Sequence, residues 1–172
     1  CKTVDLATYE RNKETIQTEL KYIVKCKNTG KICIFTNIGQ LHTIKVSDIP
    51  FGKFRDKGMP VDNISNYDSS KEDIIIITSQ TDLNLYRLLF VTKQAMCKIV
   101  SGGEFDVAKR AVAATKLSED DELVSIALLT EQQNIILQTA NGFFLRFPID
   151  EISIMKKNAV GVRGIRLNEG DY

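Results

Sequence analysis

A long internal repeat constrains the fold of this chain more than any other feature. Residues 34–64 and 137–167 align without a gap at a spacing of 103 residues, so that Gly39 corresponds to Gly142. A third, weaker copy lies between them and begins at Leu89, 55 residues after Ile34. The repeat period of about 50 residues is in the range of propeller blades, which stack because a single blade cannot bury both of its faces.

Each copy contains the pattern of a β-hairpin. The pair Asn141-Gly142 stands between two apolar runs, and Asn-Gly is the strongest short hairpin signal because a type I′ turn needs positive φ at both central residues. The second copy has Lys93-Gln94 where the others have glycine, and residues 109–117 close it after a two-residue deletion. A further short strand is predicted ahead of each hairpin, at Tyr22–Cys26, Ile74–Thr78 and Leu123–Leu129.

The sequence therefore predicts an all-β fold, a propeller-like array of four-stranded blades with about three blades plus a remnant. The predicted limits are 1–19 for the end of a preceding blade, and 20–72, 73–122 and 123–172 for the three blades. We expect Val4–Tyr9 to be the last strand of the preceding blade, with a helix near Tyr9–Thr18 as the alternative. Because the chain starts at Cys1 rather than Met, we expect it to be part of a larger protein.

Composition excludes several classes of protein. The 172 residues are 43% hydrophobic and 26% charged, which is typical of a globular domain, and no apolar run is long enough for a membrane span. The four cysteines form no C-x-x-C pair and His42 is the only histidine, so a zinc site is not expected. Cys26 and Cys33 face each other across a hairpin in one interpretation, but reduced thiols are favoured.

Charge is segregated along the repeat although the formal net charge is only +1. Residues 21–64 hold eight basic and three acidic residues, and residues 83–118 hold six basic and two acidic residues. The junctions are acidic, as in Glu119, Asp120, Asp121 and Glu122. In a radial array equivalent positions fall on equivalent surfaces, so a near-neutral total can conceal a basic stripe.

Two runs resemble a known family. NAVGVRGIRL, with FFLRFPIDEIS before it, is similar to the repeats in the C-terminal domain of the A subunit of type IIA DNA topoisomerases, and so is FTNIGQLHTIKVSDIP. The form Gly-Val-Arg-Gly-Ile-x-Leu resembles the gyrase members more than those of topoisomerase IV. The resemblance implies a six-bladed β-pinwheel whose basic outer rim binds and wraps duplex DNA, which in gyrase supports ATP-dependent negative supercoiling.

The resemblance also implies a bacterial, cytoplasmic protein that works with an ATPase B subunit in a heterotetramer. ATP, Mg²⁺ and the active-site tyrosine belong to other parts of that enzyme, so no cofactor is expected in this chain. The basic glycine-rich box of gyrase is absent from these residues, which leaves the A subunit of topoisomerase IV, a decatenating enzyme, as the alternative. The chain has about half the length that six blades of this repeat would need.

We expect DNA contacts from basic loops and strand ends, because lysine and arginine neutralise phosphates and release counterions without regard to base sequence. Ordinary solvated surface charge is the competing interpretation for any single residue. The candidates are Lys53, Arg55 and Lys57 in the first unit, Lys98, Lys109, Arg110 and Lys116 in the second, and Arg146, Lys156, Lys157, Arg163 and Arg166 in the third.

The remaining motifs are interpreted structurally. Gly39 and Gly142 are expected to supply turn geometry, and Gly58, Gly161 and Gly164 to allow bulges or close strand approach. His42 is expected to be a surface or rim residue.

No Walker loop, G-x-S-x-G elbow or base–nucleophile pair is present in the sequence, so we expect a non-catalytic module. A propeller used as a protein-interaction scaffold is the rival from a different class, and it predicts no salt-sensitive DNA affinity.

Overall fold

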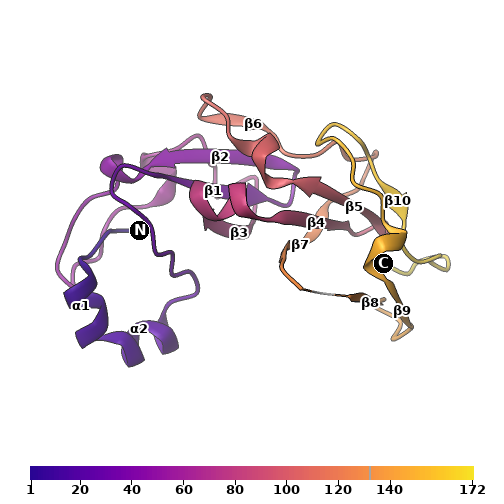
Figure 1. Ribbon diagram of the computed structural model, residues 1–172, viewed down its shortest axis with the longest axis horizontal. Coiled ribbons are helices and arrows are strands. Elements are labelled where there is room, and N and C mark those ends of the chain that lie inside the picture. Colours follow the sequence, from indigo (N-terminus) through magenta and orange to yellow (C-terminus); the bar gives the residue numbers. More distant parts are fainter. Residues whose placement is uncertain (132) are drawn as a thin grey trace.

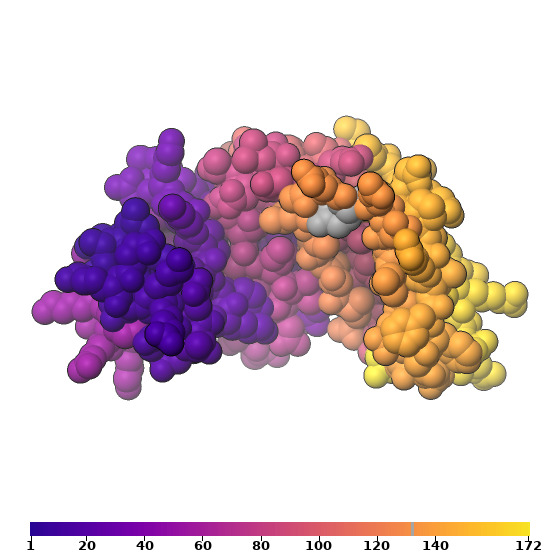
Figure 2. Space-filling view, turned by 60° about the horizontal axis from the view of Figure 1, so that its bottom comes forward, coloured from indigo at the N-terminus to yellow at the C-terminus, as the bar shows by residue number. Residues whose placement is uncertain are grey.

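Three β-hairpins follow one another along the long axis of the molecule (Figure 1). The computed structural model describes residues 1–131 and 133–172. In the space-filling view the indigo N-terminal residues likewise lie toward one end of the particle and the orange and yellow C-terminal residues at the other (Figure 2). The expected all-β array is therefore confirmed, and the short helices of the described residues lie at its N-terminal end and in its connections.

The strands are β1 (Lys31–Thr36), β2 (Gln40–Lys45), β3 (Ile74–Ser79), β4 (Arg87–Thr92), β5 (Met96–Ser101), β6 (Ala111–Ala113), β7 (Leu123–Leu129), β8 (Asn134–Gln138), β9 (Phe144–Pro148) and β10 (Val162–Arg163). The α-helices are α1 (Leu6–Arg11), α2 (Lys13–Glu19) and α3 (Gln80–Leu85). Short 3₁₀ turns are η1 (Val46–Asp48), η2 (Val61–Asn63), η3 (Gly102–Phe105) and η4 (Ile149–Glu151).

Each complete sheet takes strands from two consecutive sequence repeats. The first sheet has the order β3-β1-β2-β6 and the second has the order β10-β5-β4-β7, with antiparallel pairing throughout. The strands expected to open the second and third units, β3 and β7, thus pair with the hairpin that precedes them. Sheet membership therefore runs across the expected blade limits at residues 72 and 122.

The hairpins share one register. Phe35 faces Leu41 in the first hairpin, and Gln138 faces Phe144 in the third, so the spacing of 103 residues holds in space. The middle hairpin corresponds to the first at a spacing of 56 residues, one more than the expected 55. At this spacing Ala95 stands at the position of the turn glycine Gly39. Ala95 has φ 60°, a left-handed conformation in which glycine is more common, and that substitution hid the turn from the sequence pattern.

Glycine is required where the exchanged strands meet the hairpins. A Cβ on Gly161 would lie 2.6 Å from the Cys97 carbonyl oxygen, and the residue has φ +112°. A Cβ on Gly58, which has φ +73°, would overlap the Cys1 carbonyl oxygen. The expectation of close strand approach is confirmed at Gly161, and at Gly58 the close approach is to the backbone of Cys1, outside any strand.

The N-terminal segment differs from the expectation. Val4–Tyr9 was expected as a strand, but α1 occupies most of it, because Asp5 accepts a hydrogen bond from the Thr8 amide at 2.6 Å and caps the helix. The helical alternative is closer to the structure, since α2 follows directly. The strand expected at Tyr22–Cys26 is also wrong, because these residues have no regular structure.

Residues 1–3 nevertheless hold the place of a strand. Thr3 forms a parallel bridge with Phe51, as Ile99 of β5 does with Ile154, and 103 residues separate Phe51 from Ile154. The sequence Cys1-Lys2-Thr3-Val4 is also close to Cys97-Lys98-Ile99-Val100. The first residues therefore occupy, beside Phe51 and Met59, the position that β5 occupies beside Ile154 and Val162.

The largest core cluster joins the two complete sheets. Phe35 of β1 meets Phe90 of β4 at a ring-centroid distance of 6.0 Å and Phe105 of η3 at 5.1 Å, both edge to face. Phe35 and Phe105 are fully buried and Phe90 is 1% exposed. Within the described residues, β8 and β9 pair only with each other, and Phe144 is 66% exposed.

Candidate nucleic-acid interface

Three loops carry basic residues at corresponding places in the repeat. We call them the first basic loop (residues 52–58), the second basic loop (residues 106–110) and the third basic loop (residues 155–161). Each follows the 3₁₀ turn after the hairpin, at η1, η3 and η4 respectively. Each then leads to residues that bond to the preceding part of the chain: the Met59 amide donates to the Cys1 carbonyl oxygen, β6 pairs with β2, and β10 pairs with β5.

Most of the candidate cations are exposed, including Arg110 with 67% of its side chain accessible and Lys156 with 86%. The other exposed candidates are Lys53, Arg55, Lys57, Lys109, Lys116, Arg146, Arg163 and Arg166. Lys157 is half-buried. These side chains are accessible to a ligand, and their part in DNA binding stays a prediction.

Two loop cations pair with an acidic residue of the preceding unit. Arg110 Nη2 lies 3.7 Å from Asp48 Oδ2, and Lys156 Nζ lies 3.1 Å from Glu104 Oε1. Asp48 and Glu104 are 56 residues apart and therefore correspond in the repeat. Ion pairs this exposed contribute at most about 1 kcal/mol, so a phosphate can replace the carboxylate at little cost.

Lys98 was expected to contact DNA, and the structure corrects this. The residue is 1% exposed, and its Nζ donates to the carbonyl oxygens of Lys157 at 2.6 Å and Ala159 at 2.7 Å. The ammonium also lies 5.5 Å from the Phe90 ring centroid. Because β5 faces the next unit at this point, Lys98 has no access to a phosphate.

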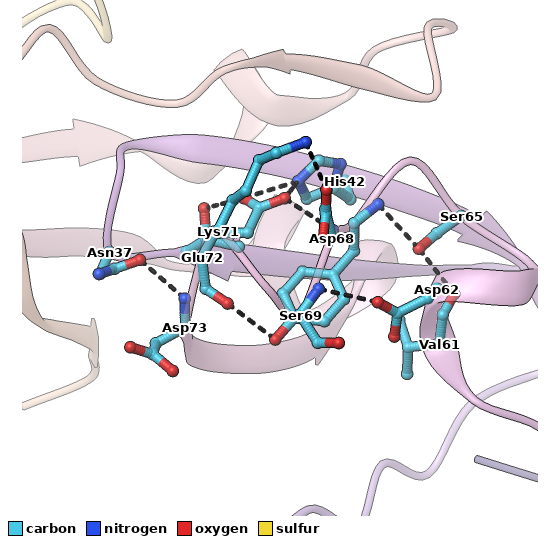
Figure 3. A network of polar contacts seen from close by, with 12 residues as sticks. Asn37, His42, Val61, Asp62, Ser65, Asp68, Ser69, Lys71, Glu72 and Asp73 are labelled. Carbon is cyan, nitrogen blue, oxygen red and sulfur yellow. Dashed lines mark hydrogen bonds and ion pairs between the residues drawn. The ribbon is translucent and has the colours of Figure 1, made fainter.

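His42 was expected at the surface, and this is also wrong. The residue is 4% exposed, and its Nε2 lies 2.9 and 3.0 Å from the two carboxylate oxygens of Glu72 (Figure 3). Glu72 is 6% exposed and also accepts hydrogen bonds from Thr36 Oγ1 at 2.7 Å and the Asp68 amide at 3.1 Å. The Tyr67 hydroxyl donates to the Glu72 carbonyl oxygen at 3.0 Å. The network ties the loop before β3 to the first sheet.

Burial on its own would raise the pKa of Glu72, but the hydrogen bonds from Thr36, His42 and Asp68 outweigh it and hold the pKa below its usual value of 4.5. A carboxyl whose pKa is depressed in the folded state stabilises the fold above pH 4.5 and loses this contribution as the pH falls through the lower folded value. We therefore expect acidification below pH 4.5 to destabilise the native chain more than a Glu72→Gln variant, which urea denaturation at several pH values measures. Parallel curves for the two proteins would contradict this role.

Among residues 1–131 and 133–172, no three His, Cys, Asp or Glu side chains gather as a metal site. Across the same part of the chain, no helix is long and apolar enough to cross a membrane.

Sequence reasoning missed several residues that organise the basic loops. Asp48 and Glu104 reach the cations of the next unit, and Lys31 donates to the Val107 carbonyl oxygen of the second basic loop at 3.0 Å. Lys2 donates to backbone carbonyls of the first basic loop. The signal that would have found Asp48 and Glu104 is their equivalent position, once the spacing of 56 residues is used.

The three repeats of this chain match one known protein family. The model of the DNA gyrase C-terminal domain, a β-propeller, matches residues 30–69, 86–130 and 133–172. The three matched segments each contain one of the hairpins described above.

Individual relatives agree with the family match. The DNA gyrase A subunit of Lawsonia intracellularis is 33% identical over 141 residues, which cover 81% of this chain and 17% of the relative. The DNA gyrase A subunit of Chlamydia muridarum is 32% identical over 162 residues, covering 89% of this chain and 19% of the relative. The chain thus spans less than a fifth of the length of these relatives.

Solved structures show the same fold. The crystal structure of the C-terminal domain of DNA topoisomerase IV superposes with a TM-score of 0.87 at 27% identity, covering 99% of this chain and 55% of that chain. The DNA gyrase A C-terminal domain superposes with a TM-score of 0.61 at 21% identity, covering 86% and 47% respectively, and at that identity it is evidence of fold alone.

Proposed function

Because the chain belongs to the family of DNA gyrase C-terminal β-propeller domains, we propose that it binds and bends duplex DNA within a type IIA topoisomerase. It contributes no catalytic step of its own. The observation that supports this most is the recurrence of exposed cations in three loops at corresponding places of successive repeats.

A repeated arrangement suits bending better than a single patch. Bending a site of about 20–30 base pairs smoothly by 40–90° costs on the order of 1–6 kcal/mol. Phosphate contacts spread over successive blades offset this cost along the whole arc, whereas one cluster holds the duplex at a single point. The contacts are to phosphates, so binding does not depend on base sequence.

We further propose that residues 1–172 are part of one pinwheel domain of a cytoplasmic protein, the A subunit of a gyrase. In this proposal it works with an ATPase B subunit, and ATP and Mg²⁺ are used elsewhere in the holoenzyme. The holoenzyme would introduce negative supercoils. The blade limits remain the proposed ones, 20–72, 73–122 and 123–172, with a remnant before them.

The A subunit of a topoisomerase IV is the second candidate, and one observation favours it: the higher TM-score to the topoisomerase IV domain, 0.87 against 0.61. The curated relatives favour gyrase by their names. A holoenzyme assay separates the two, because a gyrase supercoils relaxed plasmid with ATP and a topoisomerase IV decatenates linked circles without supercoiling.

The direct test is equilibrium binding of the chain to two unrelated duplexes of about 30 base pairs, measured over a range of about 50–200 mM salt. We expect both duplexes to bind equally, with a slope of log K against log salt of about −4 to −6, since each phosphate contact contributes about −0.9. A scaffold for protein partners would give no salt-dependent DNA affinity, and that result would overturn the proposal.

A further inference from the structure

Two lysines, Lys2 and Lys98, each donate hydrogen bonds to more than one backbone carbonyl oxygen of a basic loop. Lys98 donates to two carbonyl oxygens of the third basic loop, those of Lys157 and Ala159. Lys2 donates to three carbonyl oxygens of the first basic loop, those of Lys53, Phe54 and Asp56.

The two lysines hold corresponding places. Residues 53, 54 and 56 of the first basic loop correspond to residues 156, 157 and 159 of the third at the spacing of 103. Lys2 and Lys98 each precede the residue that bridges to the next unit, Thr3 or Ile99. The Met59 amide donates to the Cys1 carbonyl oxygen, and Val162 pairs with Cys97 in the same way. The same joint is therefore built twice from distant parts of the sequence.

We propose that Lys2 and Lys98 are positioning residues of the DNA surface, each holding the following unit's basic loop in the shape that presents its cations to phosphates. This inference rests on the proposed function. Lys98 does not touch DNA, because it is buried, and it acts through Lys156 and Lys157.

Further contacts of the second unit with the third basic loop support this role. Glu104 accepts a hydrogen bond from the Lys157 amide at 3.0 Å and pairs with Lys156, and the Lys157 amide lowers the pKa of this carboxyl. The Met155 amide donates to the Ile99 carbonyl oxygen at 2.7 Å. Burial lowers the pKa of Lys98 to about 8, because the buried ammonium loses its hydration. The two carbonyl oxygens that accept its hydrogen bonds replace part of that hydration.

The middle joint is built differently and provides a comparison within the molecule. In the middle joint His42 occupies the position that corresponds to Lys98, but its side chain contacts Glu72 of its own unit. Instead, Lys31 Nζ donates a hydrogen bond to the Val107 carbonyl oxygen at 3.0 Å, and Thr43 Oγ1 donates one to the Lys109 carbonyl oxygen at 3.1 Å. The second basic loop is therefore fixed without an ammonium from the His42 position.

The first arm of the test is amide hydrogen exchange in the full chain. Lys98→Met removes the ammonium and keeps a side chain of similar length. The amides of Met155, Lys157 and Ala159 are hydrogen-bonded and serve as reporters. We expect the exchange of these amides to become at least about tenfold faster. Without the Lys98 hydrogen bonds, local opening of the loop costs less free energy. The control is Lys93→Met, an equal change of charge at a lysine paired with Glu122, which should leave these amides unchanged.

The second arm measures affinity for duplex DNA. Lys98→Met should weaken binding about five- to tenfold, which corresponds to the loss of about one phosphate contact near 0.1 M salt. Because Lys98 is buried, the lost contact is one made by Lys156 or Lys157. In the background of Lys156→Gln with Lys157→Gln, the same substitution should have no further effect, since the groups through which it acts are already gone. Lys93→Met should change affinity less than twofold.

A purely structural role would give a different pattern. If Lys98→Met weakens binding no more than Lys93→Met, or adds its full effect in the double-variant background, the inference is wrong.

Should Lys98→Met fail to fold, Lys2→Met tests the corresponding joint at residue 2, outside the core. The control is Lys13→Met, at an exposed lysine. We expect faster exchange at the Lys53 and Asp56 amides and a similar loss of affinity, and unchanged values would contradict the inference. If the native chain binds no DNA, the proposed function fails, and the exchange arm still tests the joint.

Discussion

Combined replacement of Lys109, Arg110, Lys156 and Lys157 by glutamate is expected to weaken binding to duplex DNA by roughly 10³–10⁴-fold near 0.1 M salt. Affinity falls with salt to a power of about −0.9 per phosphate contact, so each contact is worth a factor of about 8 at that concentration. These four residues come from the second and third basic loops, and two of them form exposed ion pairs, Arg110 with Asp48 and Lys156 with Glu104. Filter binding or fluorescence anisotropy with a labelled duplex measures the change.

A matched control separates position from net charge. Lys13, Lys21, Lys25 and Lys27 are exposed residues of the N-terminal segment, and their replacement by glutamate alters the charge of the chain by the same amount. We expect this variant to lose less than tenfold in affinity, since long-range attraction between exposed charges is largely screened beyond about 10 Å at 0.1 M salt. Equal losses for the two variants would mean that total charge, and not the basic loops, accounts for binding.

Replacing Phe35 by alanine is expected to lower the free energy of unfolding by about 3–5 kcal/mol. Its ring is fully buried and contacts Phe90 and Phe105 edge to face, so the substitution leaves a cavity between the first and second sheets. Because a domain is stable by only about 5–15 kcal/mol, this is a large part of the total. Urea denaturation of the full chain, followed by circular dichroism, measures the change.

The control for that experiment is Phe144→Ala, which removes a ring of the same size from a side chain that is 66% exposed. Here we expect a change within about 0.5 kcal/mol, as for other surface substitutions. If the two variants unfold at the same urea concentration, Phe35 does not join the two sheets in solution.

The hairpins could be predicted from the sequence because their determinants are local. Asn141-Gly142 and the apolar runs beside it define turn, strands and register at once, and the ungapped spacing to Gly39 carries them to the first hairpin. The middle hairpin was misplaced by one residue because Ala95 adopts positive φ without the glycine that normally marks it.

The exchange of strands could not be predicted from local sequence, and only the resemblance to β-pinwheel domains, whose blades exchange strands, implied it. β3 and β7 are ordinary apolar strands, and nothing local in them indicates whether they pair forward or backward along the chain. That choice is made by tertiary packing. The helix α3 was also missed, although Ser79 is a typical N-cap residue, with the Asp82 amide donating to Ser79 Oγ at 3.0 Å and Ser79 Oγ donating to Asp82 Oδ2 at 2.7 Å.

The candidate site was predicted in part. Charge spacing identified the three basic loops, but residue type alone does not distinguish a lysine that faces solvent from one that faces a neighbouring blade. Lys98 and His42 occupy the same position on successive hairpins, and both are buried. Lys98 is covered by the third basic loop of the next unit, whereas His42 packs against Glu72 and Tyr67 of its own unit. Only the tertiary contacts show this.

The most direct test of the account is the shape of the bound duplex. A duplex of about 30 base pairs with a donor and an acceptor dye at its ends reports its end-to-end distance by energy transfer. If successive blades present their cations along an arc, saturating amounts of the chain should shorten that distance, and the glutamate variant of the second and third basic loops should abolish the change. Binding at full affinity with the distance unaltered would contradict the account.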